Sequence, residues 1–140
     1  MRTAALLFGI VFLAVGLLGF VPGAVTDPPP GHDLVVTASH GLLLGLFPVN
    51  VLHNLVHIIF GVWGIAAKRT DNAARGYFRT VAVAYIVLAI AGLVPGLDTM
   101  FGMVPIHGND VWLHAVLGLV GAYFGFAHRT HSVHGAARTY

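Results

Sequence analysis

The sequence predicts an all-α membrane protein, a bundle of four transmembrane helices that consists of two parallel helical-hairpin repeats. Three observations predict this class. Of the 140 residues, 57% are hydrophobic and only 9% are charged, whereas about a quarter of the residues in soluble domains are charged. Four apolar runs of roughly 17–18 residues approach the length that crosses a bilayer. Motifs also recur at a constant interval of 57 residues, as Gly45 and Pro48 recur at Gly102 and Pro105.

The expected spans follow the apolar runs in chain order. They are residues 4–21, 51–67, 78–94 and 111–127. Asn50 and Asn109 stand at the start of the second and fourth spans, and Asn is a favoured residue at the N-cap of a helix. We therefore expect these two side chains to cap their helices.

A fifth apolar stretch, residues 34–47, contains Ser39, Gly41 and Gly45 and is followed by Pro48. Because glycine and proline interrupt regular helices, we expect only a short interfacial helix here, leading into the second span. The whole is one four-span membrane domain, residues 1–128. Repeat one is residues 1–67, repeat two is residues 77–127, and residues 129–140 are expected to form a cytoplasmic tail.

The basic residues predict the orientation in the membrane. The seven Lys and Arg residues precede the first span, lie between the second and third, or follow the fourth: Arg2, Lys68, Arg69, Arg75, Arg79, Arg129 and Arg138. The other two loops carry aspartates and no basic residue. By the positive-inside rule, we expect a multi-pass protein of the inner (plasma) membrane with both termini in the cytoplasm.

Two histidines occupy equivalent positions of the two repeats. His57 is followed by Gly61 and Gly64, and His114 is followed at the same spacing by Gly118 and Gly121. An ionisable side chain within a bilayer is costly and usually functional. These histidines are therefore the first candidates for a functional site.

Further polar residues are expected near them at the outer end. His53 is one helical turn before His57, and Asp110 is one turn before His114, so each pair shares a helix face. The candidate metal ligands at this end are His40, His53, His57, His107, Asp110 and His114.

Three interpretations of this cluster stay open. The first is a b-type haem held axially by His57 and His114, with the four glycines leaving room for the flat ring. The second is a transition-metal site, because imidazole and carboxylate ligands suit Zn, Cu and non-haem Fe. The third is structural, with polar side chains bonding between helices and small residues allowing close approach. A haem or a metal ion is thus compatible with the sequence, but neither is required.

Several function classes lack support. The chain has no cysteine, which excludes disulfides, Fe–S clusters and covalent c-type haem. No nucleophile or phosphate-loop motif indicates an enzyme, and no dense basic stripe indicates nucleic-acid binding. We expect an accessory or packing subunit, or a binding module, whose partners are the lipid bilayer and other membrane proteins or a homo-oligomer. A proton or metal-ion conduit is less favoured, because apart from Arg79 at the start of span three, Tyr85 is the only ionisable residue expected in spans one and three.

A family resemblance rests on three motifs. They are Gly45-Leu46-Phe47-Pro48-Val49-Asn50, then His53-Asn54-Leu55-Val56-His57, and Asn109-Asp110-Val111-Trp112-Leu113-His114 with Leu117-Gly118. In these motifs the chain resembles a bacterial membrane family, the domain of unknown function 4383. The similarity covers nearly the whole chain except the tail. The resemblance implies a four-span membrane protein and carries no activity with it.

Overall fold

The structure is a computed structural model that describes residues 1–28, 30–31 and 33–128. It contains four α-helices: α1 (Arg2–Leu18), α2 (Val51–Ala67), α3 (Asp71–Ala91) and α4 (Asn109–Ala122), the last continued by a π-helical turn, Tyr123–Ala127. It also contains three short strands: β1 (Val25–Thr26), β2 (Gly41–Leu43) and β3 (Phe47–Val49). The predicted cytoplasmic tail, residues 129–140, lies outside the described residues.

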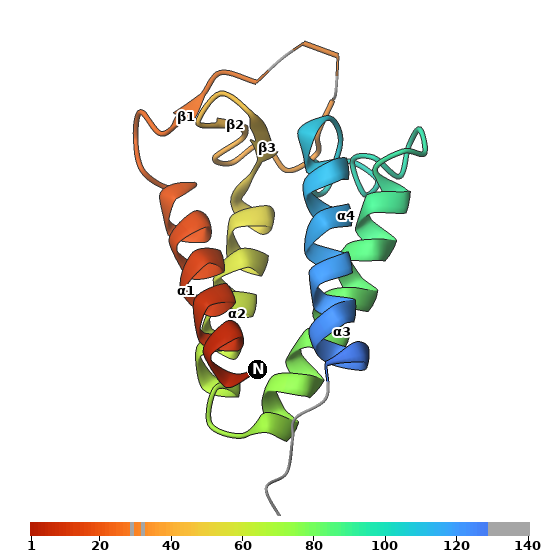
Figure 1. Ribbon diagram of the computed structural model, residues 1–140. Coiled ribbons are helices and arrows are strands. Elements are labelled where there is room, and N and C mark those ends of the chain that lie inside the picture. The colour runs from red at the N-terminus through yellow and green to blue at the C-terminus, as the bar shows by residue number, and fades with distance from the viewer. Residues whose placement is uncertain (29, 32, 129–140) are drawn as a thin grey trace, which may run out of the picture.

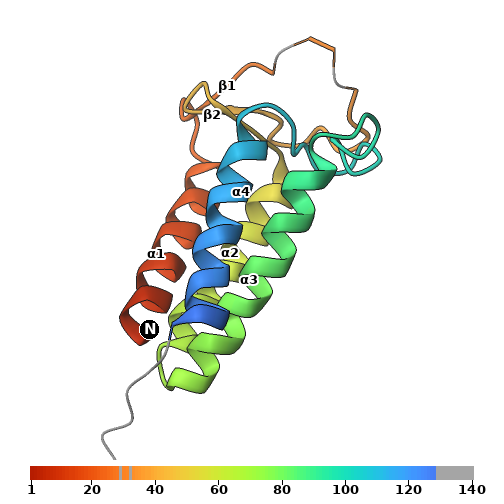
Figure 2. The ribbon, with the colours of Figure 1, turned by 45° about the vertical axis from the view of Figure 1, so that its right-hand side comes forward.

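The helices run alternately up and down, and both termini of the bundle lie at one end (Figures 1 and 2). Helix α1 packs along α2, and α3 packs along α4. The start of α1, the α2–α3 connection and the end of α4 lie together at what we call the lower end. The strands and the loop between α3 and α4 cover the opposite, upper end.

Glycines at equivalent positions of the repeats allow each helix pair to pack closely. A Cβ atom added at Gly61 would lie 2.5 Å from the backbone nitrogen of Leu13 on α1. A Cβ at Gly118 would lie 3.0 Å from the backbone nitrogen of Ile86 on α3. Small residues at helix contacts are typical of helices packed in membranes, and here the missing side chain is what lets the backbones meet.

Two helical segments are long and apolar enough to cross a membrane. They are Asp71–Ala91 and Asn109–Ala127. The other two helices, Arg2–Leu18 and Val51–Ala67, are also apolar but have 17 residues each. By length and composition, two of the helices among the described residues are therefore candidate membrane spans.

The predicted interfacial helix at residues 34–47 is wrong. This segment instead supplies β2 and its turn to β3, in an antiparallel sheet with the order β1–β2–β3. Leu44 and Gly45 form the turn with positive φ angles of 53° and 71°, a conformation that a right-handed helix excludes. The fold is thus mostly helical with a small sheet, rather than wholly α-helical.

The predicted N-cap is confirmed for α2 but is wrong for α4. The Asn50 side chain accepts a hydrogen bond from the His53 backbone N–H at 3.0 Å and caps α2, as predicted. In contrast, Gly108 is the N-cap of α4, and Asn109 is its first helical residue. The Asn109 side chain donates instead to the Leu46 carbonyl of the neighbouring turn, at 3.1 Å.

Candidate metal centre

Helices α2 and α4 bring three histidines together beneath the upper end of the bundle. His53 and His57 lie one turn apart on α2, and His114 faces them from α4. One ring nitrogen from each residue lies within 4.8 Å of the other two. All three side chains are buried, and His114 is only 2% exposed. We call these residues the three-histidine cluster.

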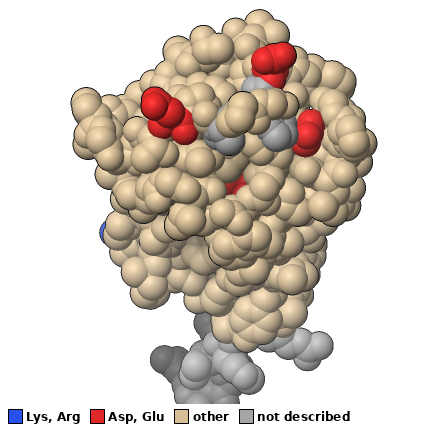
Figure 3. Space-filling model, turned by 90° about the horizontal axis from the view of Figure 1, so that it is seen from above, with Lys and Arg blue, Asp and Glu red and all other residues tan. Residues whose placement is uncertain are grey.

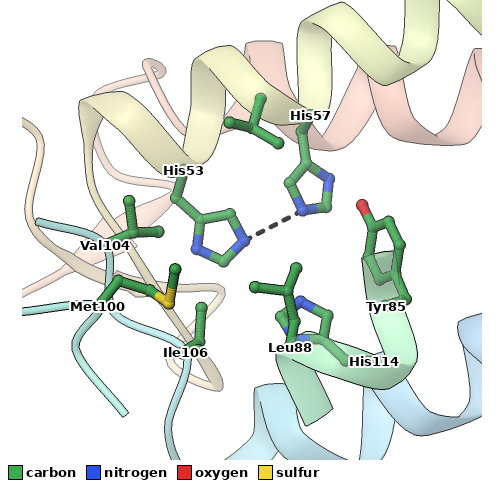
Figure 4. A pocket seen from close by; sticks show the side chains of 9 residues that line it. His53, His57, Tyr85, Leu88, Met100, Val104, Ile106 and His114 are labelled. Carbon is green, nitrogen blue, oxygen red and sulfur yellow. Dashed lines mark hydrogen bonds between the residues drawn. The ribbon is translucent and has the colours of Figure 1, made fainter. Parts of the chain in front are cut away.

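The contacts of His53 define which of its nitrogens faces the cluster. Its Nδ1 lies 3.2 Å from the Pro105 carbonyl oxygen, and its Nε2 lies 3.1 Å from Nε2 of His57. A carbonyl oxygen only accepts hydrogen bonds, so in this contact the proton of His53 is on Nδ1. The Nε2 lone pair then points toward His57 and accepts a hydrogen bond from its Nε2–H (Figure 4). A separation of 3.1 Å suits two nitrogens bound to one ion, because Zn–N bonds are about 2.0–2.1 Å long.

Asp110 lies beside His53, on its Nδ1 side. Its Oδ2 is 3.7 Å from His53 Nδ1, which is too long for a hydrogen bond. The carboxylate is nevertheless buried, with 2% of the residue exposed. Metal-binding histidines usually present their second ring nitrogen to a carbonyl or carboxylate, which orients the ring. Pro105 and Asp110 occupy that position relative to His53.

Three buried polar atoms of this region have no hydrogen-bond partner among the described residues. They are His57 Nδ1, His114 Nδ1 and Asp110 Oδ2. A buried polar atom without a partner costs about 1–3 kcal/mol, and such groups are rare in proteins. These unpartnered atoms are a cost of the arrangement, and they differ from the Nε2 atoms of His53 and His57, which face each other.

A small cavity adjoins the cluster (Figure 4). Its volume is about 160 Å³, and it is lined by His53, Val56, His57, Tyr85, Leu88, Met100, Val104, Ile106 and His114. In the close view, the hydroxyl of Tyr85 points toward the His57 ring. The Tyr85 ring packs edge-to-face against His114, with 5.1 Å between ring centroids. Helix α3 thus completes a site whose histidines come from α2 and α4.

Aromatic side chains fill the interior of the bundle next to His57. Phe12 packs edge-on against the His57 ring with 5.4 Å between centroids, and it stacks on Tyr85 at the same distance. Phe60 packs edge-on against Tyr85. The cluster therefore lies above an aromatic layer that fills the centre of the bundle.

The predicted ligand set is only partly assembled. The structure brings together His53, His57 and His114 and places Asp110 next to His53. His40 and His107 are half-buried and do not belong to the three-histidine cluster. Sequence reasoning missed Tyr85 as a site residue. The signal was its position as an ionisable residue in the middle of span three, residues 78–94.

The glycines predicted to accommodate a haem lie in helix contacts. Gly61 and Gly64 face α1, while Gly118 and Gly121 face α3. The adjoining cavity, at about 160 Å³, is also below the roughly 300 Å³ at which pockets for larger ligands begin. Haem ligation by His57 and His114 stays a prediction from the sequence alone.

One comparison with known proteins gives a result. The family model described as domain of unknown function (DUF4383) matches residues 2–127. The chain belongs to the DUF4383 family. The match confirms the resemblance noted in the sequence, and it includes the three-histidine cluster, Asp110 and Tyr85 of this DUF4383 protein. No curated protein and no solved structure matches the chain.

Proposed function

We propose that this DUF4383 protein is a four-span protein of the inner (plasma) membrane that binds a transition-metal ion at His53, His57 and His114. It acts as a binding module or accessory subunit rather than as an enzyme. The observation that carries the proposal is the convergence of three buried histidine nitrogens within 4.8 Å.

The distribution of polarity supports a membrane location for all four helices. Large apolar side chains are exposed on each helix, for example Val11 (57%), Ile59 (63%), Val87 (57%) and Leu119 (66%). Polar side chains are buried instead: Asn50, His53, Asn54, His57, Asp110 and His114. A soluble protein rarely exposes so much contiguous apolar surface, whereas lipid is a suitable solvent for it.

The charges are also separated between the two ends. Figure 3 shows the upper end from above, with acidic side chains spread over it and basic ones only at its margin. The described basic residues lie at or near the lower end: Arg2, Lys68, Arg69, Arg75 and Arg79. Under the positive-inside rule, this separation favours a cytoplasmic lower end.

The donor set indicates the class of ion. Three imidazoles suit Zn, Cu, Ni or Fe(II), and three protein ligands leave one position of a tetrahedral ion open. The carbonyl of Pro105, 3.2 Å from His53 Nδ1, provides the orienting contact that such ligands usually have.

A second candidate function is purely structural packing. It is favoured by the Asn54 side chain, which donates to the Gly19 carbonyl at 2.9 Å and ties α2 to the end of α1. The conduit interpretation is disfavoured by Phe12 and Tyr85, which stack directly next to the cluster.

Metal analysis distinguishes the first two functions. The detergent-purified protein, made without an affinity tag, is loaded with Zn²⁺ or Cu⁺, desalted and analysed by mass spectrometry. We expect about one ion per chain. His57→Asn and His114→Asn should each lower the affinity by at least the 10–100-fold that loss of a supporting residue typically causes. His40→Asn is the matched control, because His40 lies outside the cluster. Wild-type protein that takes up no metal would contradict metal binding and leave only the packing function. A His57→Asn variant that binds metal as tightly as the wild type would do the same.

A further inference from the structure

We infer that the metal ion binds a small uncharged ligand, of the size of a diatomic gas, within the apolar cavity, and that Tyr85 donates a hydrogen bond to this ligand. The inference rests on the proposed function, because it concerns the fourth position of the same metal site.

The first step is the direction of the open coordination position. The Nε2 atoms of His53 and His57 face each other at 3.1 Å, so an ion held by them lies on that side of His53. Asp110 lies on the opposite, Nδ1 side of the ring and is not part of the three-histidine cluster. Asp110 is therefore a positioning residue for His53, and the fourth ligand must come from the cavity that all three histidines line.

The second step is the size of that ligand. The cavity volume is about 160 Å³. An engineered apolar cavity of about 150 Å³ in another protein stays dry and takes up benzene or xenon. A molecule of a few atoms therefore fits beside the histidines without moving the helices.

The third step is the charge of the ligand. Apart from the histidines and Tyr85, the described lining residues are the apolar side chains of Val56, Leu88, Met100, Val104 and Ile106. Met100, Val104 and Ile106 belong to the loop between α3 and α4, which covers the cavity (Figure 4). An anion that enters such surroundings loses its hydration without compensation. An uncharged, lipid-soluble molecule does not carry this cost.

The fourth step is the hydrogen-bond donor. Tyr85 provides the only hydroxyl among the described residues that line the cavity. Contacts with His114 and Phe12 hold its ring, and the hydroxyl points toward His57 (Figure 4). When the ion is Cu⁺ or Fe(II), a fixed donor beside it favours a ligand with a lone pair on an atom near the ion, as in O₂, NO or CO. Donors in the pockets of other metal sites select such ligands in this way.

Carbon monoxide bound to the Cu⁺-loaded protein tests the inference, with the C–O stretch measured by infrared spectroscopy. We expect one CO per copper and one narrow band. Tyr85→Phe should keep its copper but shift the band and weaken CO binding several-fold. Tyr77→Phe is the matched control, because it removes another buried phenol hydroxyl two turns earlier on α3. Leu88→Phe should fill part of the cavity and weaken CO binding while copper stays bound. If Leu88→Phe does not fold, Val56→Phe is used in its place.

The outcomes separate the two proposals. A copper-loaded protein that binds no CO, or that binds azide as tightly as CO, would overturn the inference and leave metal binding intact. An identical C–O stretch in wild type and Tyr85→Phe would remove the role of Tyr85. CO binding that neither cavity-filling variant weakens would place the ligand elsewhere. A protein that takes up no metal would defeat the proposed function itself, and the inference with it.

Discussion

Asn50 connects the two repeats at the upper end of the molecule. Its amide nitrogen donates to the carbonyl oxygens of Met103, at 2.6 Å, and Val36, at 3.0 Å. Its side-chain oxygen accepts from the backbone N–H of His53. One fully buried residue therefore fixes the start of α2 against the loop that carries Pro105. That loop orients His53, so Asn50 contributes to the geometry of the cluster without touching a ligand.

Asn50→Ala should lower the free energy of unfolding by about 2–3 kcal/mol, because it removes a helix cap and two hydrogen bonds to the carbonyl oxygens of Val36 and Met103. Asn109→Ala is the control. Its side chain also donates to a backbone carbonyl, but in an exposed setting, so we expect a loss of about 0.5–1 kcal/mol. Unfolding in detergent micelles, followed by circular dichroism, measures both. Equal losses would contradict the bridging role of Asn50.

The site was only partly predictable at the scale of single residues. The spacing of His53 and His57 was sufficient to place them on one helix face. The repeat was sufficient to place His114 opposite them. Tyr85 and Ile106 could not be assigned, because their position depends on how α3 and the following loop pack. Distances between helices are set by long-range contacts that no local pattern contains.

The helix pairs depend on close contacts between backbones. Gly9 on α1 and Gly64 on α2 face each other, and a Cβ at Gly64 would lie 2.8 Å from the Gly9 Cα. Gly121 stands in the equivalent place of the second pair, against Ala82. The glycine spacing in the sequence therefore has a packing explanation in both hairpins. A role of these glycines beside a haem stays a prediction from the sequence.

Gly61→Ala should destabilise the first hairpin by about 1–3 kcal/mol, since the new methyl group would overlap the Leu13 backbone and overpacking has costs of this size. Gly76→Ala is the matched control within a helix, because nothing lies within 4 Å of a Cβ added there. That change should be neutral or stabilise by about 0.5–1 kcal/mol. The same unfolding assay compares them. A Gly61→Ala variant that is as stable as the wild type would show that α1 and α2 can move apart without loss of stability.

The positions of the helices were predictable where hydrophobicity was continuous, although α3 begins at Asp71, before the expected span of residues 78–94. The prediction failed where the backbone geometry decided. The apolar runs located all four helices. Residues 34–47 were apolar as well, and composition alone favoured a short helix there. Positive φ angles at Ser39, Leu44 and Gly45 and pairing with β1 and β3 produce strands instead. A strand pairing depends on distant partners, which a single segment does not reveal.

At the scale of the whole molecule, the two repeats have kept their packing and diverged in their polar residues. Gly61 and Gly118 serve the same purpose in the two hairpins. In contrast, His53 corresponds to Asp110, and Asn50 corresponds to His107. The duplicated sequence therefore predicts a symmetric bundle, but the cluster takes two histidines from one repeat and one from the other. The first repeat supplies His53 and His57, and the second supplies His114 together with the Pro105 carbonyl and the Asp110 side chain that lie beside His53.

The orientation in the membrane can be tested directly, because the chain contains no cysteine. Asp27→Cys introduces a thiol in an exposed residue at the upper end, and Arg69→Cys introduces one in the exposed α2–α3 connection at the lower end. A membrane-impermeant maleimide should label the first variant in intact spheroplasts and the second only after lysis. The remaining basic residues still favour a cytoplasmic lower end in Arg69→Cys. Labelling of Arg69→Cys alone in intact spheroplasts would reverse the orientation and place the three-histidine cluster near the cytoplasm.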